Sequence, residues 1–187
     1  MSIDSGEAIA AALQVSVVGA NELIPPGPAG IYAWWVHEDH LGDASPRLPE
    51  VPIEDAARPW SLLYVGIGPK RPGSRTLGDR LRKDHGGSSI GSSTFRQSLA
   101  ALLMEYLALT PKSGYDRSRL VDEAPLSKWI VENARLSAVA VKRPWDYEDD
   151  VIQHLNPPLN LKPGFHPYRH DVDRARKELR RACGLPS

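Results

Sequence analysis

The sequence predicts an α+β fold, an α/β sandwich in which a small, three-stranded and mostly antiparallel sheet is flanked by helices. The chain has 187 residues, which fits a single domain spanning 1–187. Short runs of β-branched and aromatic residues, bounded by proline and glycine, are typical of strands. Other segments repeat apolar residues at the helical period. Proline is frequent, at 17 of 187 residues, so we expect short elements joined by stiff connections.

Three segments have the character of strands. Gly30–Val36 (GIYAWWV) follows a rigid proline-rich break, Ser61–Gly66 (SLLYVG) is the second, and Leu136–Val141 is the third. The first two could pair as a hairpin, although residues 38–59 form a long, polar and proline-dotted insertion between them. The expected sheet is therefore built around the first two strands.

Amphipathic segments account for most of the remaining chain. The clearest helix starts at Ser92 or Ser93 as N-cap and ends before Pro111. Its apolar residues share one face, namely Phe95, Leu99, Leu102, Leu103, Tyr106 and Leu107. The other expected helices are Glu7–Leu13, Thr76–Asp84, Leu126–Asn133, Trp145–Leu155 and Val172–Cys183.

Charge is balanced overall but unevenly distributed. The chain holds 23 basic and 23 acidic residues, which argues against a protein that coats DNA generally. Residues 69–84 contain six basic and two acidic residues, and residues 162–181 contain seven basic and three acidic ones. These segments could form a positive face that attracts phosphates, or could be two ordinary solvated helices.

Composition also excludes several classes of protein. The single cysteine, Cys183, allows neither an internal disulfide nor a zinc site built from cysteines. No apolar run approaches the ~18 residues that a membrane span requires. Residues 1–18 carry two acids and no basic residue, unlike a secretory signal, so a cytoplasmic protein is expected. Neither a dinucleotide-binding nor a P-loop glycine pattern occurs, so we expect no nucleotide cofactor.

Five short motifs occur in order on the expected elements. Gly30–Tyr32 (GIY) lies in the first strand, and Tyr64–Gly66 (YVG) lies in the second. Leu77–Leu81 (LGDRL) lies on the basic helix. Glu148 lies on the helix after the third strand, and Pro157–Asn160 (PPLN) ends twelve residues later. Together these motifs resemble those of the GIY-YIG endonucleases, and the last spacing looks like that of the nuclease domain of the bacterial excision-repair subunit.

The resemblance implies a nuclease-like core over 28–162, followed by a basic helical tail over 163–187. It also implies a DNA endonuclease that depends on Mg²⁺ or Mn²⁺, with Glu148 as the metal ligand. Arg80 is then expected to clamp the scissile phosphate, because a planar and permanently charged guanidinium fits phosphate oxygens. The catalytic set implied by the resemblance is Tyr32, Tyr64, Arg80, His85, Glu148 and Asn160.

The individual roles follow the same resemblance. Tyr32 is expected to accept a proton from the attacking water or to position that water, with His85 assisting. Tyr64 is expected to contact the phosphate or to assist the base, and which tyrosine takes the proton stays open. Asn160 is expected to brace the site through hydrogen bonds.

Two features depart from the family pattern. The interval between the first two strands is much longer than the usual hairpin. A histidine or tyrosine commonly stands four residues after the arginine, where this chain has Asp84. Either His85, one residue later, fills that role, or the role is vacant. The alternative function is therefore an inactive nucleic-acid-binding module of the same fold. A protein-interaction domain with accidental similarity is a third reading.

Further residues are candidates for contacts with DNA. Arg82 and Lys83 lie on the basic helix, and Arg96 lies at the start of the long helix, where free N–H groups could hold a flanking phosphate. Simple N-capping is the alternative for that helix start. A homodimer or a protein partner could supply specificity, and the tail could extend the DNA footprint or form a dimer contact.

Overall fold

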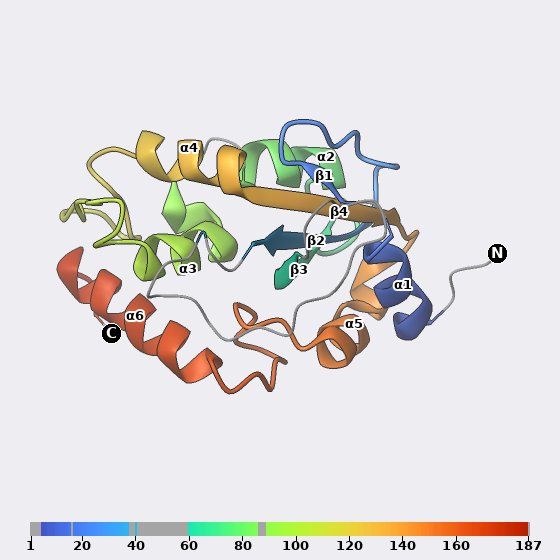
Figure 1. Cartoon of the computed structure of the whole chain (residues 1–187). Coiled ribbons are helices and arrows are strands. Elements are labelled where there is room, and N and C mark those ends of the chain that lie inside the picture. Colours follow the sequence, from blue (N-terminus) through green and yellow to red (C-terminus); the bar gives the residue numbers. More distant parts are fainter. Residues whose placement is uncertain (1–4, 16, 38–39, 41–59, 86–88, 187) are drawn as a thin grey trace.

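The computed structural model describes residues 5–15, 17–37, 40, 60–85 and 89–186. Within this part of the chain, strands form one antiparallel sheet in the order β1-β4-β2-β3 (Figure 1). The strands are β1 (Val18–Gly19), β2 (Gly30–Val36), β3 (Ser61–Gly68) and β4 (Ala134–Ala140). The α+β prediction is confirmed, with β1 as an additional strand. The insertion expected at 38–59 lies outside the described residues, apart from His40.

The helices surround this sheet on both faces. The short helix α2 continues directly into a π-helical turn, η3, while η4 and η5 are 3₁₀ turns. Ser93 caps the longest predicted helix, accepting the N–H of Arg96 at 3.2 Å as the sequence predicts. The bounds are α1 (Gly6–Leu13), α2 (Leu77–Asp79), η3 (Arg80–His85), η4 (Ile90–Ser92), α3 (Thr94–Leu102), α4 (Ala124–Asn133), η5 (Pro144–Asp146), α5 (Glu148–Leu155) and α6 (Arg169–Ala182).

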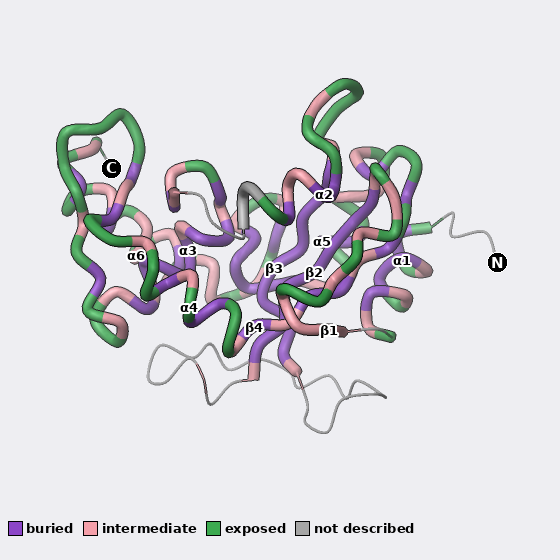
Figure 2. Tube along the Cα trace, turned by 90° about the horizontal axis from the view of Figure 1, so that it is seen from above, coloured by how far each residue is buried: buried purple, intermediate pink, exposed green. Residues whose placement is uncertain are grey.

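Strands β2 and β3 are buried along their whole length (Figure 2). Alternate residues of a strand point to opposite faces, so each face of β2 builds its own core. Tyr32 and Trp34 join the core formed with α2, α3, α4 and α6. Ile31 and Trp35 join the core formed with α1 and α5. Covering both faces explains why β2 is apolar throughout instead of alternating with polar residues.

Helix α3 is shorter than the sequence predicts. It ends at Leu102, and the chain then turns, with Ala108 in the left-handed region at a φ of 49°. Tyr106, which was expected on the buried face, is 67% exposed. Leu103 and Leu109 lie in the chain after α3 and are buried there without being helical. The spacing of apolar residues therefore predicted a longer helix than the structure has.

No helix in the described ranges combines the length and the apolar character needed to cross a membrane.

The C-terminal helix α6 packs against α3 (Figure 1). Its residues Val172 and Leu179 are fully buried in the same core as Tyr32 and Trp34. Helix α6, which lies in the basic segment expected at 163–187, therefore contributes to this core.

Candidate active site

A glycine creates the space that Tyr32 occupies. The register of β2 and β3 places Tyr32 opposite Gly66. A Cβ atom on Gly66 would lie only 2.4 Å from the Tyr32 hydroxyl oxygen. Tyr64 precedes Gly66 by two residues on the same face of β3, and the rings of the two tyrosines are 6.4 Å apart between centroids. The glycine of YVG therefore lets two tyrosines share one end of the sheet.

Replacement of Gly66 by alanine is expected to destabilise the domain and displace Tyr32. The new methyl group overlaps a fully buried ring, and overpacking of this kind costs about 1–3 kcal/mol. Chemical denaturation measures the change in the free energy of unfolding. Gly27→Ala is the matched control, because the nearest atom to a Cβ there lies 3.8 Å away. Equal stability of the two variants would contradict this account.

Close packing of α2 against the end of β3 determines the position of Arg80. A Cβ atom on Gly68 would lie 2.6 Å from the Cα atom of Leu77, so only glycine lets α2 begin directly against the end of β3. The N–H of Leu77 donates to the carbonyl of Pro28 at 2.9 Å, which anchors that first residue of α2. Arg80 follows at the start of η3. Its guanidinium lowers the pKa of both phenols, Tyr32 and Tyr64, through its charge and hydrogen bonding.

Glu148 reaches the same site from the helix on the other face of the sheet. Val151 and Ile152 of α5 are buried and pack in the core on that face of the sheet. Gly6 lets α1 approach α5 closely, since a Cβ atom there would lie 2.7 Å from the Cβ atom of Asp150. Glu148, the first residue of α5, is half-buried, and its charge acts on both tyrosines.

Burial shifts the pKa of each acidic group at the site. Desolvation raises the pKa of the Tyr32 phenol strongly, Tyr64 adds to that rise, and Arg80 opposes it. Desolvation likewise raises the pKa of Tyr64, again opposed by Arg80. The pKa of Glu148 is raised by burial, while Lys70 and Arg80 lower it. Both phenols therefore keep their protons near neutral pH.

Asn160 supports the site from behind β3. Its side-chain oxygen accepts the N–H of Val65 and its amide donates to the carbonyl of Val65, each at 2.9 Å. The N–H of Leu159 also donates to the carbonyl of Leu63 at 3.0 Å. These bonds satisfy the outer edge of β3 on either side of Tyr64, so the strand that carries Tyr64 is held in place.

A cationic cleft of about 530 Å³ adjoins Arg80. The turn before α2 is closed by Ser74, whose hydroxyl accepts the N–H groups of Lys70 and Arg71 at 3.0 and 3.2 Å. Arg117 comes from the connection between α3 and α4, which the sequence analysis did not single out. The described residues lining the cleft include no carboxylate; they are Lys70, Arg71, Ser74, Arg75, Arg80, Ser92 and Arg117.

The model of the GIY-YIG catalytic domain matches residues 30–182. The chain belongs to the GIY-YIG family. Membership in this family implies nuclease activity, and the match extends through α6. Comparisons with curated proteins and with solved structures found no match.

The donor set of this GIY-YIG site fits a hard divalent cation held jointly with substrate. Among the described residues, no group of three or more His, Cys, Asp or Glu side chains forms a ready metal cage. Mg²⁺ usually binds through one or two carboxylates together with substrate phosphates and waters. Glu148, which is half-buried and whose pKa Lys70 and Arg80 of the cleft lower, can be such a carboxylate.

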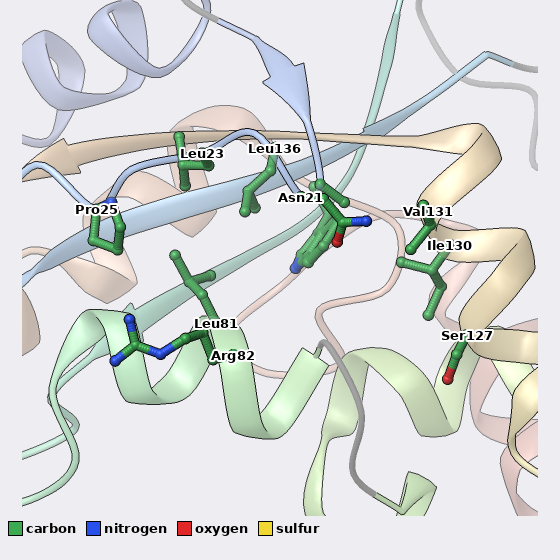
Figure 3. A pocket seen from close by; sticks show the side chains of 11 residues that line it. Asn21, Leu23, Pro25, Leu81, Arg82, Ser127, Ile130, Val131 and Leu136 are labelled. Atoms are coloured by element: carbon green, nitrogen blue, oxygen red, sulfur yellow. The ribbon is translucent and has the colours of Figure 1, made fainter.

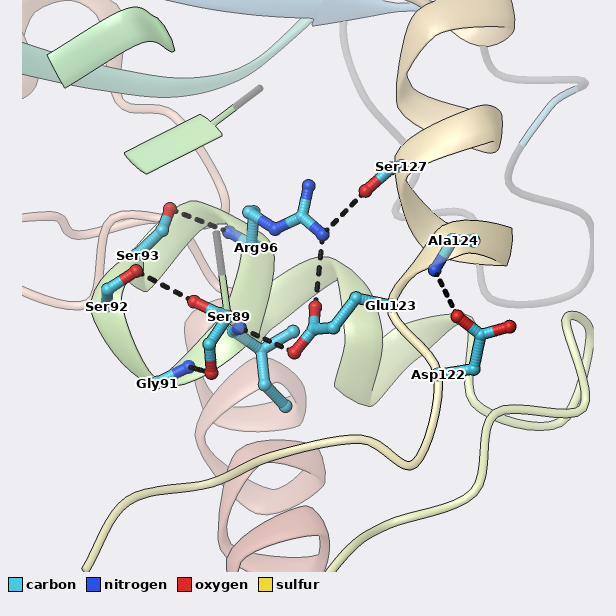
Figure 4. Close-up of polar contacts among 10 residues, drawn as sticks. Ser89, Gly91, Ser92, Ser93, Arg96, Asp122, Glu123, Ala124 and Ser127 are labelled. Carbon is cyan, nitrogen blue, oxygen red and sulfur yellow. Dashed lines mark hydrogen bonds and ion pairs between the residues drawn. The ribbon is translucent and has the colours of Figure 1, made fainter. Parts of the chain in front are cut away.

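Arg96 is not part of the GIY-YIG site. Its side chain is fully buried, and it donates to Glu123 at 3.1 Å and to Ser127 at 2.9 Å (Figure 4). Glu123 also accepts the N–H of Ile90 at 2.9 Å, so this ion pair ties α3 and η4 to α4. The expected contact of Arg96 with DNA is therefore wrong, because the guanidinium is committed to the interior of the protein.

Arg82, another predicted phosphate contact, does not line the cleft. Arg82, two residues after Arg80 on η3, lines a different and largely apolar pocket of about 360 Å³ (Figure 3). Its side chain is 72% exposed and lies 3.8 Å from Asp79. The side chains of Lys83 and His85 lie outside the described part of the structure. A role for His85 stays a prediction.

Proposed function

We propose that this GIY-YIG protein is a divalent-metal-dependent endonuclease that hydrolyses phosphodiester bonds in DNA. The observation that carries the proposal is that Arg80, which lines the cationic cleft, interacts with Tyr32, Tyr64 and Glu148. A cleft lined by lysine and arginine is complementary to a phosphate backbone. Glu148, whose pKa Lys70 and Arg80 of the cleft lower, supplies the carboxylate that a metal held on a phosphate requires.

In this proposal each residue has a role set by its surroundings. Arg80 contacts the scissile phosphate with its planar fork and stabilises the negative charge that develops on the phosphoryl oxygens. Tyr32 and Tyr64 act as neutral phenols, since burial raises the pKa of both. They orient the attacking water and the phosphate by hydrogen bonds. In this proposal the phenols position the water and do not remove its proton. Glu148 holds Mg²⁺ or Mn²⁺, which when bound neutralises charge on the phosphate.

The pH dependence of cleavage follows from Glu148. The carboxylate must be ionised to hold the cation, and burial raises its pKa. Activity is therefore expected to fall on acidification at a higher pH than for an exposed glutamate. Raising the Mg²⁺ concentration is expected to move this acidic limb to lower pH, because cation and proton compete for the same oxygens. Initial rates measured across pH at two Mg²⁺ concentrations test this. The account would be contradicted if the pH at which activity falls were the same at both Mg²⁺ concentrations.

Cleavage of supercoiled plasmid tests the proposed function directly. The wild-type protein is incubated with Mg²⁺ or Mn²⁺, with EDTA as the control, and nicked and linear products are separated on a gel. Cation-dependent nicking is the expected result. If folded protein cleaves neither plasmid, branched DNA nor RNA but binds DNA in a salt-sensitive way, the proposal fails and the inactive binding module replaces it.

A further inference from the structure

The chain between α3 and α4 forms a small hairpin, residues 111–120, beside the end of α6 (Figure 1). Its first and last residues face each other in an antiparallel bridge. The N–H of Lys112 donates to the carbonyl of Arg119 at 2.9 Å, and the thiol of Cys183 donates to the same carbonyl at 3.3 Å. The base of the hairpin is therefore held against α6.

The hairpin reaches the cationic cleft through Arg117, which lines the cleft together with Arg80. A Cβ atom on Gly91 would lie 2.9 Å from the Cβ atom of Arg117 and 2.8 Å from the carbonyl of Ser118, so glycine lets η4 pack directly on this segment. Ser118 is almost fully buried, and its hydroxyl accepts the side-chain amide of Gln97 at 3.0 Å. Packing on η4 and α3 therefore fixes Arg117 at the cleft.

The exposed ring of Tyr115 gathers two further cations next to Arg117. The Nζ atom of Lys112 lies 5.3 Å from the ring centroid, and the guanidinium carbon of Arg119 lies 5.0 Å from it. Among the described residues, no carboxylate forms an ion pair with either cation. Arg117 itself lies 4.0 Å from the exposed carboxylate of Asp116. The positive charges of the hairpin are therefore available to an external anion.

The hairpin cations are close enough to the cleft to contact the same strand of DNA. Tyr115 and Arg119 each lie two residues from Arg117, and two residues span at most about 7 Å. Phosphates follow one another along each strand of DNA about every 3.4 Å of the helix axis. A strand with one phosphate at Arg117 therefore has its next phosphates within reach of Lys112 and Arg119.

We propose that the hairpin 111–120 is a second contact surface for DNA, on which Lys112 and Arg119, gathered on the ring of Tyr115, bind the phosphate backbone next to the cationic cleft. The inference rests on the proposed function for the identity of the substrate. Contacts of this kind fix the position of the DNA and do not read its sequence. They are made equally in the ground state and the transition state, so they strengthen binding without accelerating the saturated reaction.

Binding of a labelled DNA duplex, measured by fluorescence anisotropy in EDTA at several salt concentrations, tests the surface. Each phosphate contact contributes about 0.9 to the slope of log K against log salt. Lys112→Gln is expected to reduce the slope by about that amount and to weaken binding about five- to tenfold. Lys128→Gln, the matched control, removes the same charge from an exposed side chain of α4 and is expected to bind as wild type. An unchanged slope in Lys112→Gln would overturn the proposal.

Tyr115→Leu tests the ring while every charge is retained. Binding is expected to weaken about two- to fivefold, because Lys112 and Arg119 lose the aromatic face that gathers them. Tyr106→Leu replaces another exposed tyrosine, in the turn after α3, and is expected to bind as wild type. If Tyr115→Leu bound DNA as tightly as wild type, the ring would have no part in the surface and the proposal would be rejected.

Kinetics distinguish failure of this proposal from failure of the proposed function. In an active enzyme, Lys112→Gln is expected to raise KM for DNA and to leave kcat unchanged, and a loss confined to kcat would reject the hairpin surface. An inactive wild-type protein whose salt slope still depends on Lys112 would reject the nuclease and keep the surface. An active wild-type protein whose slope does not change in Lys112→Gln would keep the nuclease and reject the surface.

Discussion

Glu148→Gln is expected to abolish cleavage while the fold and the binding of DNA persist. The substitution keeps the size of the half-buried side chain but removes the charge that would hold a divalent cation at the site. Loss of a residue that merely supports a metal ligand costs about 10–100-fold in affinity or activity. Loss of the ligand itself should therefore reduce the single-turnover rate by at least about 100-fold. Plasmid cleavage under Mg²⁺ and under Mn²⁺ measures the effect.

Asp149→Asn is the matched control for Glu148→Gln. It removes the same charge from the next residue of α5, where the side chain is exposed. Because Asp149 raises the pKa of Glu148, its removal is expected to leave the rate near neutral pH intact and to shift the acidic limb to lower pH. Fluorescence anisotropy with labelled DNA and thermal unfolding verify that Glu148→Gln still binds and folds. If Glu148→Gln cleaved DNA at the wild-type rate, the proposal that Glu148 holds a metal at this site would be rejected.

The strands could be predicted where both faces are buried. The run GIYAWWV is stiff and apolar throughout, and β2 begins and ends where the sequence indicates. By contrast, β1 has only two residues, Val18 and Gly19, which is too short to show any alternation. Its pairing with Leu136 and Arg135 of β4 is a tertiary contact with no local signal. A short edge strand of this kind therefore cannot be predicted from the pattern of residues along the chain.

The candidate site divides in the same way. Tyr32, Tyr64 and Arg80 lie in motifs, and the order of those motifs was enough to expect them side by side. Arg117 lies in no motif, and it reaches the cleft because the segment between α3 and α4 folds back, with Ser118 bonded to Gln97 of α3. Nothing in the sequence around Arg117 distinguishes it from its exposed neighbours.

Arg96 shows the opposite error. An arginine in the first turn of a helix, in a chain that resembles a nuclease, looks like a phosphate contact. The residue that decides its role, Glu123, lies 27 positions later and approaches only when α4 packs beside α3. A charged side chain is buried only when it is paired, and sequence spacing does not reveal that partner.

Arg80→Lys is expected to slow cleavage by about 10²-fold or more at saturating DNA, although it preserves the positive charge. Arg80 lines the cationic cleft and lowers the pKa of both tyrosines, so one planar group acts on the cleft and on both phenols. A lysine ammonium is a point charge on a flexible stem and cannot present the same fork. Single-turnover rates are expected to rank wild type above Arg80→Lys, and Arg80→Lys above Arg80→Ala.

The split between binding and rate decides which property of Arg80 matters. If the guanidinium acted only as one of several charges in the cleft, Arg80→Lys would leave both the DNA affinity and the saturated rate unchanged, because Lys70, Arg71, Arg75 and Arg117 remain. The proposed role predicts a large loss of rate with a small loss of affinity, since the fork acts on the phosphate as its charge develops. Arg181→Lys, an exposed replacement in the last turn of α6, provides the control for changing an arginine to lysine elsewhere.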